Sequence, residues 1–406
     1  MSPHSPSSRA DVLLYVQHLL GIGHIRRAAA LARAFQRAGL KVVFVTGGLP
    51  VGGLGLDEVP GGIGPGSIEV VQLPPARSQD DSFKVILDAD NQPIDDAWKA
   101  RRRDLLLEVY RRHRPRVVMT ELFPFGRRKM RFELEPLVAA ARTANPPALV
   151  ACSLRDIVNR PEGAEKTAWM VDRFTRFYDL LYVHGDPRYF RLEDSFPESA
   201  AVAERLHYTG YVTEAAEAVE AARQKAGSSG QGEVVVSAGG GAVGAALLHC
   251  ALAARPLSPL AAAPWRLLVG PNTPESDFQA LAAAAPPGVT VERARPDFVA
   301  LLTRARLSIS QGGYNTLMEV MAAGLPGVVV PFAGGSETEQ TQRARVLAEA
   351  GLITVVDEET LAPATLAEGI ARALRQGGTA GGAPFRFDGA AETARHLIAQ
   401  LKQAAA

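Results

Sequence analysis

The sequence predicts an α/β protein made of two domains, each built on a parallel sheet. Short apolar runs alternate with amphipathic stretches from end to end, which is typical of stacked βαβ units. The chain has 406 residues, enough for two domains with separate cores. Hydrophobic residues make up 47% and charged residues 21% of the chain, a composition that excludes a disordered protein.

Six buried strands and three clear helices are expected in the first half. The helical patterns cover residues 25–38, 95–113 and 131–143. The strands are expected at 12–17, 41–46, 68–73, 116–120, 148–153 and 180–184.

The second half starts the same alternation again and ends in a helix at 390–403. A helical stretch is expected between residues 209–212 and the strand 234–238, and further strands are expected at 265–270, 289–293, 306–310, 327–331 and 353–356. We therefore expect a Rossmann-like domain over residues 1–220 and a second one over 221–385. Residues 386–406 form a C-terminal helix, for which packing back on the N-terminal domain is one option. Doubly wound domains bind ligands at the carboxyl ends of their strands, so two of them predict a cleft and place the function in loops after strands.

Charge and cysteine content narrow the classes of function. Lys and Arg number 44 against 43 Asp and Glu, so no overall charge indicates a nucleic-acid partner. Cys152 and Cys250 lie in apolar runs and are expected to be buried, reduced thiols. No apolar run near the start is long enough for a signal peptide or a membrane span. We expect a cytoplasmic protein without a cofactor, and the spacing of His, Cys and Asp predicts no metal site.

A glycine-rich loop with a histidine follows the first strand. Gly21 and Gly23 allow a tight turn into the helix, but Arg26 stands where the dinucleotide fingerprint has its third glycine. His24 lies at the helix start, where an imidazole can take a proton near neutral pH. The alternative is that His24 only packs the turn. As a base with an ordinary pKa of about 6.5, it predicts that activity falls on the acid side of neutrality.

Two further glycine-rich turns follow strands in the second half. Free backbone amides at a helix start can hold a phosphate, although a tight strand-to-helix turn alone also explains such glycines. The lysine of a P-loop is missing, which disfavours ATP hydrolysis. The first turn contains Gly239, Gly240 and Gly241, and the second contains Gly312, Gly313, Tyr314, Asn315 and Thr316.

Three polar residues accompany the second glycine turn. Glu319 lies about two helical turns along the helix that begins there, near a ligand whose phosphate rests on the helix start. A carboxylate at that distance can accept two ribose hydroxyls. Glu339 and Gln340 begin the next helix and offer an acceptor and an amide to sugar hydroxyls.

The segment 305–352 resembles the donor-binding half of GT-B glycosyltransferases, above all the group that contains MurG and the plant galactolipid synthases. That resemblance implies two Rossmann-like domains facing across a cleft, the GT-B fold. It also implies that the glutamate binds the nucleotide ribose, the glycine turns bind diphosphate, and the acid–glutamine pair binds the donor sugar. The matching positions are Gly312, Gly313, Thr316, Glu319, Gly324, Pro326, Pro331, Glu339, Gln340 and Ala344.

The N-terminal half resembles acceptor-side segments less specifically. The loop with Gly23 and His24 is similar to the family's acceptor loop, whose histidine is a proposed base. With Arg27 it also resembles the G-x-G-H-x-x-R loop of UDP-sugar hydrolases that share the fold. Residues 121–137, 153–158 and 182–187 resemble a bacterial group of predicted glycosyltransferases.

Basic residues after two strands are candidates for the acceptor site. Arg127 and Arg128 alternate with phenylalanines and could hold an acidic or phosphorylated acceptor or anionic lipid headgroups. Arg155 and Asp156 follow the next strand. A solvated helix start and structural ion pairs are the alternatives for these residues.

The sequence as a whole predicts a metal-independent, inverting glycosyltransferase. A nucleotide diphosphate sugar, most simply a UDP-sugar, is the expected donor, and a small-molecule or lipid-linked hydroxyl is the expected acceptor, with peripheral membrane contact left open. A nucleotide-sugar hydrolase, a UDP-sugar 2-epimerase and a non-catalytic nucleotide-sugar-binding protein are the alternatives.

Overall fold

The computed structural model consists of two α/β units. Unit 1 comprises Met1–Val212 and Asp388–Ala406, and unit 2 comprises Thr213–Phe387. The residues that the structure describes are 9–56, 65–80, 83–159, 163–225, 227, 229–238, 244–270, 272–332, 339–379 and 385–404.

Unit 1 is built on a parallel sheet of seven strands in its described residues, in the order β3-β2-β1-β6-β7-β8-β9. The order reverses direction between β1 and β6, which makes this pair the switch point of a doubly wound sheet. The strands are β1 (Val12–Val16), β2 (Val42–Thr46), β3 (Ile68–Gln72), β6 (Val117–Glu121), β7 (Leu149–Arg155), β8 (Leu180–His184) and β9 (Leu206–Tyr208).

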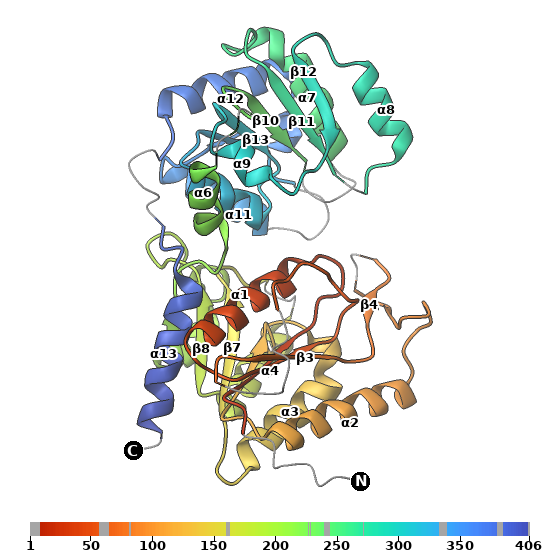
Figure 1. The fold of residues 1–406 in the computed structure, drawn as a ribbon, viewed down its shortest axis with the longest axis vertical. Helices are drawn as coiled ribbons and strands as arrows, with labels where there is room; N and C mark the ends of the chain where they lie inside the picture. The colour runs from red at the N-terminus through yellow and green to blue at the C-terminus, as the bar shows by residue number, and fades with distance from the viewer. Residues whose placement is uncertain are drawn as a thin grey trace. The chain divides into compact units, whose positions relative to one another are not determined.

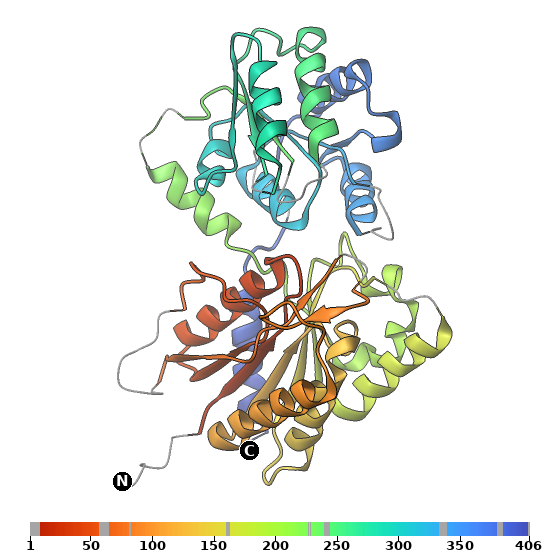
Figure 2. The same cartoon turned by 90° about the vertical axis from the view of Figure 1, so that its right-hand side faces the viewer.

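Helices cover both faces of this sheet, as Figures 1 and 2 show. In β1, Leu13 and Tyr15 pack with α2, α3 and α4 on one face, while Val12, Leu14 and Val16 pack with α1 and α13 on the other. A strand buried on both faces explains the continuous apolar run of β1. The helices are α1 (Gly23–Arg37), α2 (Asp96–His113), α3 (Arg131–Thr143), α4 (Ala164–Phe177), α5 (Leu192–Ser195) and α13 (Gly389–Gln403), with the 3-10 turns η1 (Arg128–Met130) and η2 (Pro197–Arg205) and the hairpin β4 (Arg77–Ser78) and β5 (Ile86–Leu87).

The C-terminal helix α13 belongs to unit 1. It lies along α1 (Figure 1), and Leu397 and Leu401 are buried in the core that they share. The boundary expected between residues 220 and 221 falls inside α6 (Ala215–Gln224), which packs on helices of unit 2.

The sheet of unit 1 ends with a short strand that was not expected from the sequence. The last strand of the sheet is β9, which pairs with β8 from Leu206 to Tyr208. Gly210 then turns the chain away with a φ of 87°, a conformation that glycine adopts at little cost. Val212 makes only an isolated bridge to Asp388.

Unit 2 is built on a second parallel sheet, of six strands in the described residues, in the order β12-β11-β10-β13-β14-β15. Its switch point lies between β10 and β13. The strands are β10 (Val234–Ser237), β11 (Trp265–Val269), β12 (Val289–Arg293), β13 (Leu307–Ser310), β14 (Gly327–Val329) and β15 (Thr354–Val355). The helices are α6, α7 (Ala245–Ala254), α8 (Glu275–Ala283), α9 (Phe298–Leu302), α10 (Tyr314–Ala323), α11 (Glu339–Glu349) and α12 (Pro363–Gln376), with the 3-10 turns η4 (Arg255–Leu257) and η5 (Glu358–Thr360).

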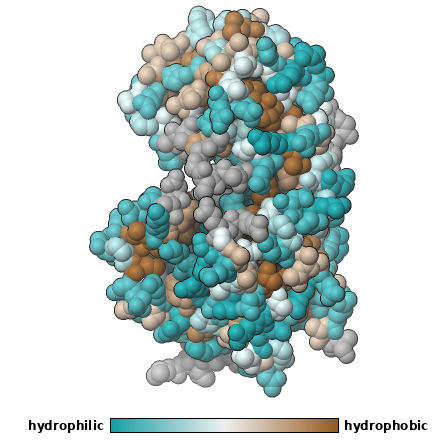
Figure 3. Space-filling view, turned by 180° about the vertical axis from the view of Figure 1, so that it is seen from behind, coloured by the Kyte–Doolittle hydropathy of each residue, from teal (hydrophilic) through white to brown (hydrophobic). Residues whose placement is uncertain are grey.

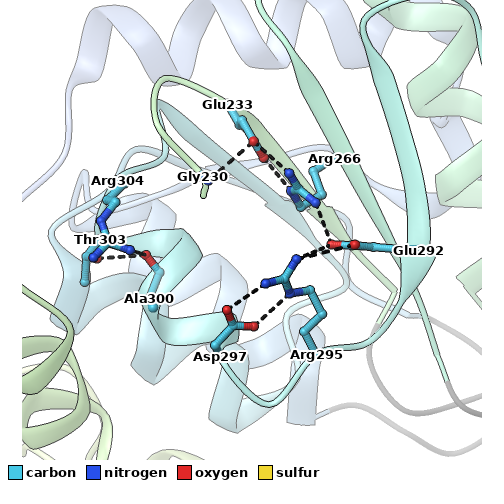
Figure 4. A network of polar contacts seen from close by, with 9 residues as sticks. All are labelled: Gly230, Glu233, Arg266, Glu292, Arg295, Asp297, Ala300, Thr303 and Arg304. Carbon is cyan, nitrogen blue, oxygen red and sulfur yellow. Dashed lines mark hydrogen bonds and ion pairs between the residues drawn. The ribbon is translucent and has the colours of Figure 1, made fainter. Parts of the chain in front are cut away.

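A chain of alternating charges crosses one side of this sheet (Figure 4). The guanidinium of Arg266 on β11 donates to Glu233 at 2.6 Å and to Glu292 on β12 at 2.7 Å. Arg295 continues the chain from Glu292 to Asp297. Networks of this kind stabilise more than isolated surface pairs do, so these residues tie the edge of the sheet to the segment before α9.

The surface is predominantly hydrophilic on the face that Figure 3 shows, with apolar residues scattered among polar ones. Scattered apolar residues are ordinary for a folded protein. Among the described residues, no helix combines the length and the apolar character needed to cross a membrane. Cys152 is buried as expected, whereas Cys250 is only partly buried, because it lies on a less covered side of α7.

Candidate functional site

A histidine–glutamate pair lies at the switch point of unit 1. His24 is the second residue of α1, which follows the loop after β1, and Glu121 is the last residue of β6. The His24 Nδ1 lies 2.8 Å from the Glu121 Oε1. Arg27, one turn further along α1, donates to the same carboxylate oxygen. Adjacent parallel strands end at one edge of the sheet, and this is how residues 97 positions apart meet.

The hydrogen bond fixes which nitrogen of His24 carries the proton. A carboxylate can only accept, so Nδ1 donates to Glu121 at 2.8 Å, which outweighs the longer 3.3 Å approach of the Arg27 Nη2 to the same nitrogen, and Nε2 keeps its lone pair. The carboxylate is fully buried, while 17% of the His24 side chain is exposed. The imidazole can therefore be reached from solvent while its partner is shielded, which is the arrangement of an oriented general base.

Burial keeps this histidine neutral. Burial lowers the pKa of His24 to about 4, an effect that Glu121 opposes and the charges of Arg127 and Arg155 reinforce. Burial alone would raise the pKa of Glu121, but contacts with His24 and Arg27 outweigh it and hold that pKa below its usual range. At neutral pH the pair thus consists of a neutral imidazole hydrogen-bonded to a carboxylate. The pKa of His24 is lower than the value near 6.5 expected from the sequence.

The sequence-predicted acceptor residues lie around this pair in different ways. Gly23 begins α1, and Arg127 donates from Nε to the backbone oxygen of Gln17 at 2.7 Å. Arg128 stacks on the ring of Trp169, 5.5 Å from its centroid.

Arg155 and Asp156 stand at the end of β7, the strand next to β6, and differ in burial. Arg155 ends β7 and is close enough for its charge to lower the pKa of His24. Asp156 is fully buried, and its Oδ1 accepts from the backbone nitrogen of Ile157 at 3.1 Å. Acceptor contact by Asp156 stays a prediction.

A second histidine near the pair is fully engaged. Both ring nitrogens of His184 are hydrogen-bonded, Nε2 to Ser153 at 2.8 Å and Nδ1 to Thr209 at 2.9 Å. Burial lowers the pKa of His184 to about 3. Because both of its ring nitrogens are hydrogen-bonded, His184 joins β7 to the segment after β9 and offers no free nitrogen to a substrate.

In unit 2, the second glycine turn also lies at the switch point, after β13. Gly312 has a φ of 80°, and a Cβ there would lie 2.6 Å from Cγ1 of Val329, so only glycine fits. Gly313 caps α10, whose first residues, Tyr314, Asn315 and Thr316, present amides without partners inside the helix. Such a helix start favours an anion.

The first glycine turn follows β10 in the sequence. Gly239, Gly240 and Gly241 lie outside the described residues. Gly244, the next described residue, lies close to the end of β10. A Cβ at this position would lie 2.0 Å from the Cβ of Ala238.

The three polar residues expected to meet the donor lie on α10 and α11. Glu319 is partly exposed on α10. Glu339 is buried, and its Oε1 accepts from Arg343 at 2.7 Å, so this carboxylate is already engaged by an arginine. The Oε1 of Gln340 is buried and has no hydrogen-bond partner among the described residues. An unused buried acceptor is unusual in a folded protein. Contact of Gln340 with a donor stays a prediction.

Sequence reasoning missed Glu121, Arg27 and Arg343 as site residues. Arg343 is fully buried and its guanidinium lies over the Tyr314 ring, 5.1 Å from the centroid, so it joins α11 to the glycine turn. Glu121 could have been found as the polar end of the strand that pairs with β1, had the strand order been known. Among the described residues, no group of three or more His, Cys, Asp or Glu could hold a metal ion.

Comparisons with known proteins agree with this architecture. Residues 234–381 match the glycosyltransferase family 28 C-terminal domain. The UDP-N-acetylglucosamine–N-acetylmuramyl-(pentapeptide) pyrophosphoryl-undecaprenol N-acetylglucosamine transferase of Exiguobacterium sp. is 40% identical over 80 residues, which is 20% of this chain and 22% of that protein. The same-named protein of Thermotoga neapolitana is 31% identical over 91 residues, 22% of this chain and 27% of its own length. The chain thus matches only about a quarter of the length of these curated relatives.

Solved structures extend the likeness to the whole fold. The calicheamicin glycosyltransferase CalG4 has a TM-score of 0.60 at 19% identity, over 98% of this chain and 100% of that one. MurG of Acinetobacter baumannii has a TM-score of 0.59 at 15% identity, over 97% and 99%. The two units therefore form a GT-B fold, the fold of one large class of glycosyltransferases. Within that class, the sequence of its C-terminal domain makes this chain MurG-like.

Proposed function

We propose that this protein is an inverting glycosyltransferase that moves a sugar from a nucleotide diphosphate sugar, most simply a UDP-sugar, to a hydroxyl acceptor. The observation that carries the proposal is the His24–Glu121 pair at the switch point of unit 1. The family match of unit 2 supports a nucleotide-sugar donor. The acceptor is a small molecule or a lipid-linked compound, and contact with a membrane surface stays open.

The chemistry assigns one role to His24. Its Nε2 takes the proton of the acceptor hydroxyl as the oxygen attacks the anomeric carbon on the face opposite the leaving group. The new bond joins the acceptor oxygen to that carbon, the bond from the carbon to the phosphate oxygen breaks, and the nucleoside diphosphate leaves. Glu121 stabilises the imidazolium that forms. General base catalysis of this kind is worth about two to four powers of ten in rate.

Unit 2 supplies the groups for the donor. The amides at the start of α10 face the charge that develops on the leaving diphosphate. Glu319 accepts from the ribose hydroxyls, and Gln340 with Glu339 contacts the sugar. No Asp-x-Asp element adjoins either glycine turn in the sequence, so we propose that amides and helix dipoles, not a divalent ion, meet this charge.

A panel of nucleotide sugars tests the proposal. The protein is incubated with each donor, with and without candidate acceptors, and both the nucleotide and the sugar product are identified. Transfer to an acceptor with inverted anomeric configuration, lost in His24→Gln, is expected. Release of free sugar at a rate that no acceptor changes would identify a hydrolase. Conversion of the donor into an isomeric nucleotide sugar would identify an epimerase. Donor binding without turnover would contradict an enzyme of any kind.

A further inference from the structure

A pocket of about 520 Å³ lies at the end of unit 1 where the strands of its sheet begin. Three of the segments that enclose it lead into neighbouring strands: Arg9 lies before β1, residues 114–115 before β6 and residues 144–146 before β7. His24 follows β1 and Glu121 ends β6, so both lie at the other end of these strands. The pocket is therefore separate from the candidate site of unit 1.

Positive charge gathers around this pocket without a carboxylate to neutralise it. No Asp or Glu belongs to its described lining. Within the described part of the chain, the side chains of Arg9, Arg111 and Arg114 form no ion pair, and the Nε of Arg9 donates only to the backbone oxygen of Arg114, at 2.9 Å. Arg112 also lines the pocket, but it has an interaction of its own and is not needed for the charge excess.

Two of these arginines act on one buried phenol, which shows that their charges converge. Tyr110 lies in the last turn of α2, is 8% exposed and donates its hydroxyl to the backbone oxygen of Ala140 on the neighbouring helix α3, at 3.3 Å (Figure 1). Burial raises the pKa of Tyr110, and the charges of Arg9 and Arg114 oppose that rise. Like charges held this close together repel each other unless an anion lies between them.

A buried ring nitrogen in the wall of the pocket has no partner. His113, the last residue of α2, lines the pocket and is 2% exposed. Its Nε2 lies 3.4 Å from the Oε1 of Glu69 on β3, outside the pocket, whereas its Nδ1 is buried without a hydrogen-bond partner among the described residues. Buried polar atoms in folded proteins nearly always have a partner, so this nitrogen indicates a group from outside the chain.

The dipole of α2 explains only part of the charge. Basic residues are favoured in the last turn of a helix, which accounts for Arg111. It does not account for Arg9, which lies on no helix. Arg114 caps α2 in the left-handed conformation, with a φ of 44°, where glycine is the usual residue. The side chain of Arg114, and not its backbone, therefore explains an arginine at this position.

We propose that this pocket is a second binding site, which takes a small dissolved molecule with two or more linked phosphate groups. Guanidinium groups suit such a ligand because their planar donors can bind two phosphate oxygens at once. A single phosphate ester carries a charge of about −2 at neutral pH, so three arginines match linked phosphates better than one phosphate. The site does not depend on the proposed function and lies away from the residues assigned to it.

Inorganic tripolyphosphate is the probe, because it consists of linked phosphates alone. It is titrated calorimetrically into the full-length protein at constant ionic strength, without divalent ions and in excess UDP, which keeps a donor site occupied. The inference predicts one bound molecule per chain, held more tightly than orthophosphate. In Arg111→Gln/Arg114→Gln, both of whose side chains are exposed, the affinity should fall by about tenfold or more.

The matched control is Lys129→Gln/Lys166→Gln, which removes the same charge from a different pocket of unit 1. Its affinity for tripolyphosphate should stay within about twofold of the wild type. Tripolyphosphate should also raise the melting temperature of the wild type and of this control, but not that of Arg111→Gln/Arg114→Gln. Equal weakening by both double variants would show attraction by overall charge and would overturn the inference.

Two further results would contradict a site for linked phosphates. One is tripolyphosphate that does not bind, or binds no more tightly than orthophosphate. The other is binding of the protein to phosphatidylglycerol vesicles that Arg111→Gln/Arg114→Gln abolishes, without binding of tripolyphosphate, which would assign these arginines to a membrane surface. Sugar transfer is not a readout in any of these experiments, so their outcome is independent of the proposed function.

Discussion

The exchange Glu121→Gln tests the histidine–glutamate pair in the most direct way. Glutamine keeps the shape of the side chain but has no charge to stabilise the imidazolium that forms on His24. With about 4 Å between the charge centres and an effective dielectric constant of about 20, the lost interaction is worth about 4 kcal/mol. That corresponds to about a 10³-fold lower kcat, measured as UDP release with the donor and acceptor that the panel identifies.

Arg27→Met is the matched control for Glu121→Gln. Both variants break the contact between Arg27 and Glu121, so both should lose thermal stability through an uncompensated buried charge. Only Glu121→Gln also removes the carboxylate from His24, so its kcat should be at least about tenfold below that of Arg27→Met. If Glu121→Gln turns over within about threefold of the wild type with the same pH profile, the pair is not catalytic.

Three further predictions concern the donor, metals and pH. Glu319→Ala should weaken UDP binding by about 1–3 kcal/mol in a calorimetric titration, and unchanged affinity would remove Glu319 from the site. EDTA should leave turnover unchanged, whereas loss that magnesium or manganese restores would contradict amide-based stabilisation of the leaving group. Because the pKa of His24 is lowered to about 4, kcat/KM should stay level as pH falls through 6 and should drop only near pH 4. A midpoint near 6.5 would mean that His24 is not buried as the structure has it.

Local sequence signals were enough for most of the fold. The expected helix at 131–143 and the expected strand at 180–184 match α3 and β8 residue for residue. Periodicity is a local property of the sequence. In a doubly wound domain, an apolar run between two helices is expected to be a buried strand. The strand β9 was not expected, because its pairing with β8 covers only Leu206 to Tyr208, too few residues for a recognisable alternation.

Only some residues of the candidate site could be predicted from the sequence, for a related reason. His24 and the Gly312 turn stand at strand ends and can be found from the sequence, because a loop after a strand is a local feature. Glu121 becomes a partner of His24 only because β6 pairs with β1, and strand order is a property of the whole sheet. Arg343 was missed because its target, Glu339, looked like a ligand contact and not like an ion-pair partner.

Nucleotide affinity and kcat measured together on His24→Gln test the central claim most directly. Glutamine can hydrogen-bond but cannot take the acceptor's proton, and His24 lies in unit 1, whereas the helices proposed to bind the donor lie in unit 2. We predict a kcat lowered by about 100-fold or more, with UDP affinity within about twofold of the wild type and an unchanged melting temperature. Turnover at the wild-type rate would show that His24 is not the base. Parallel losses of melting temperature and activity would show that it only packs the turn.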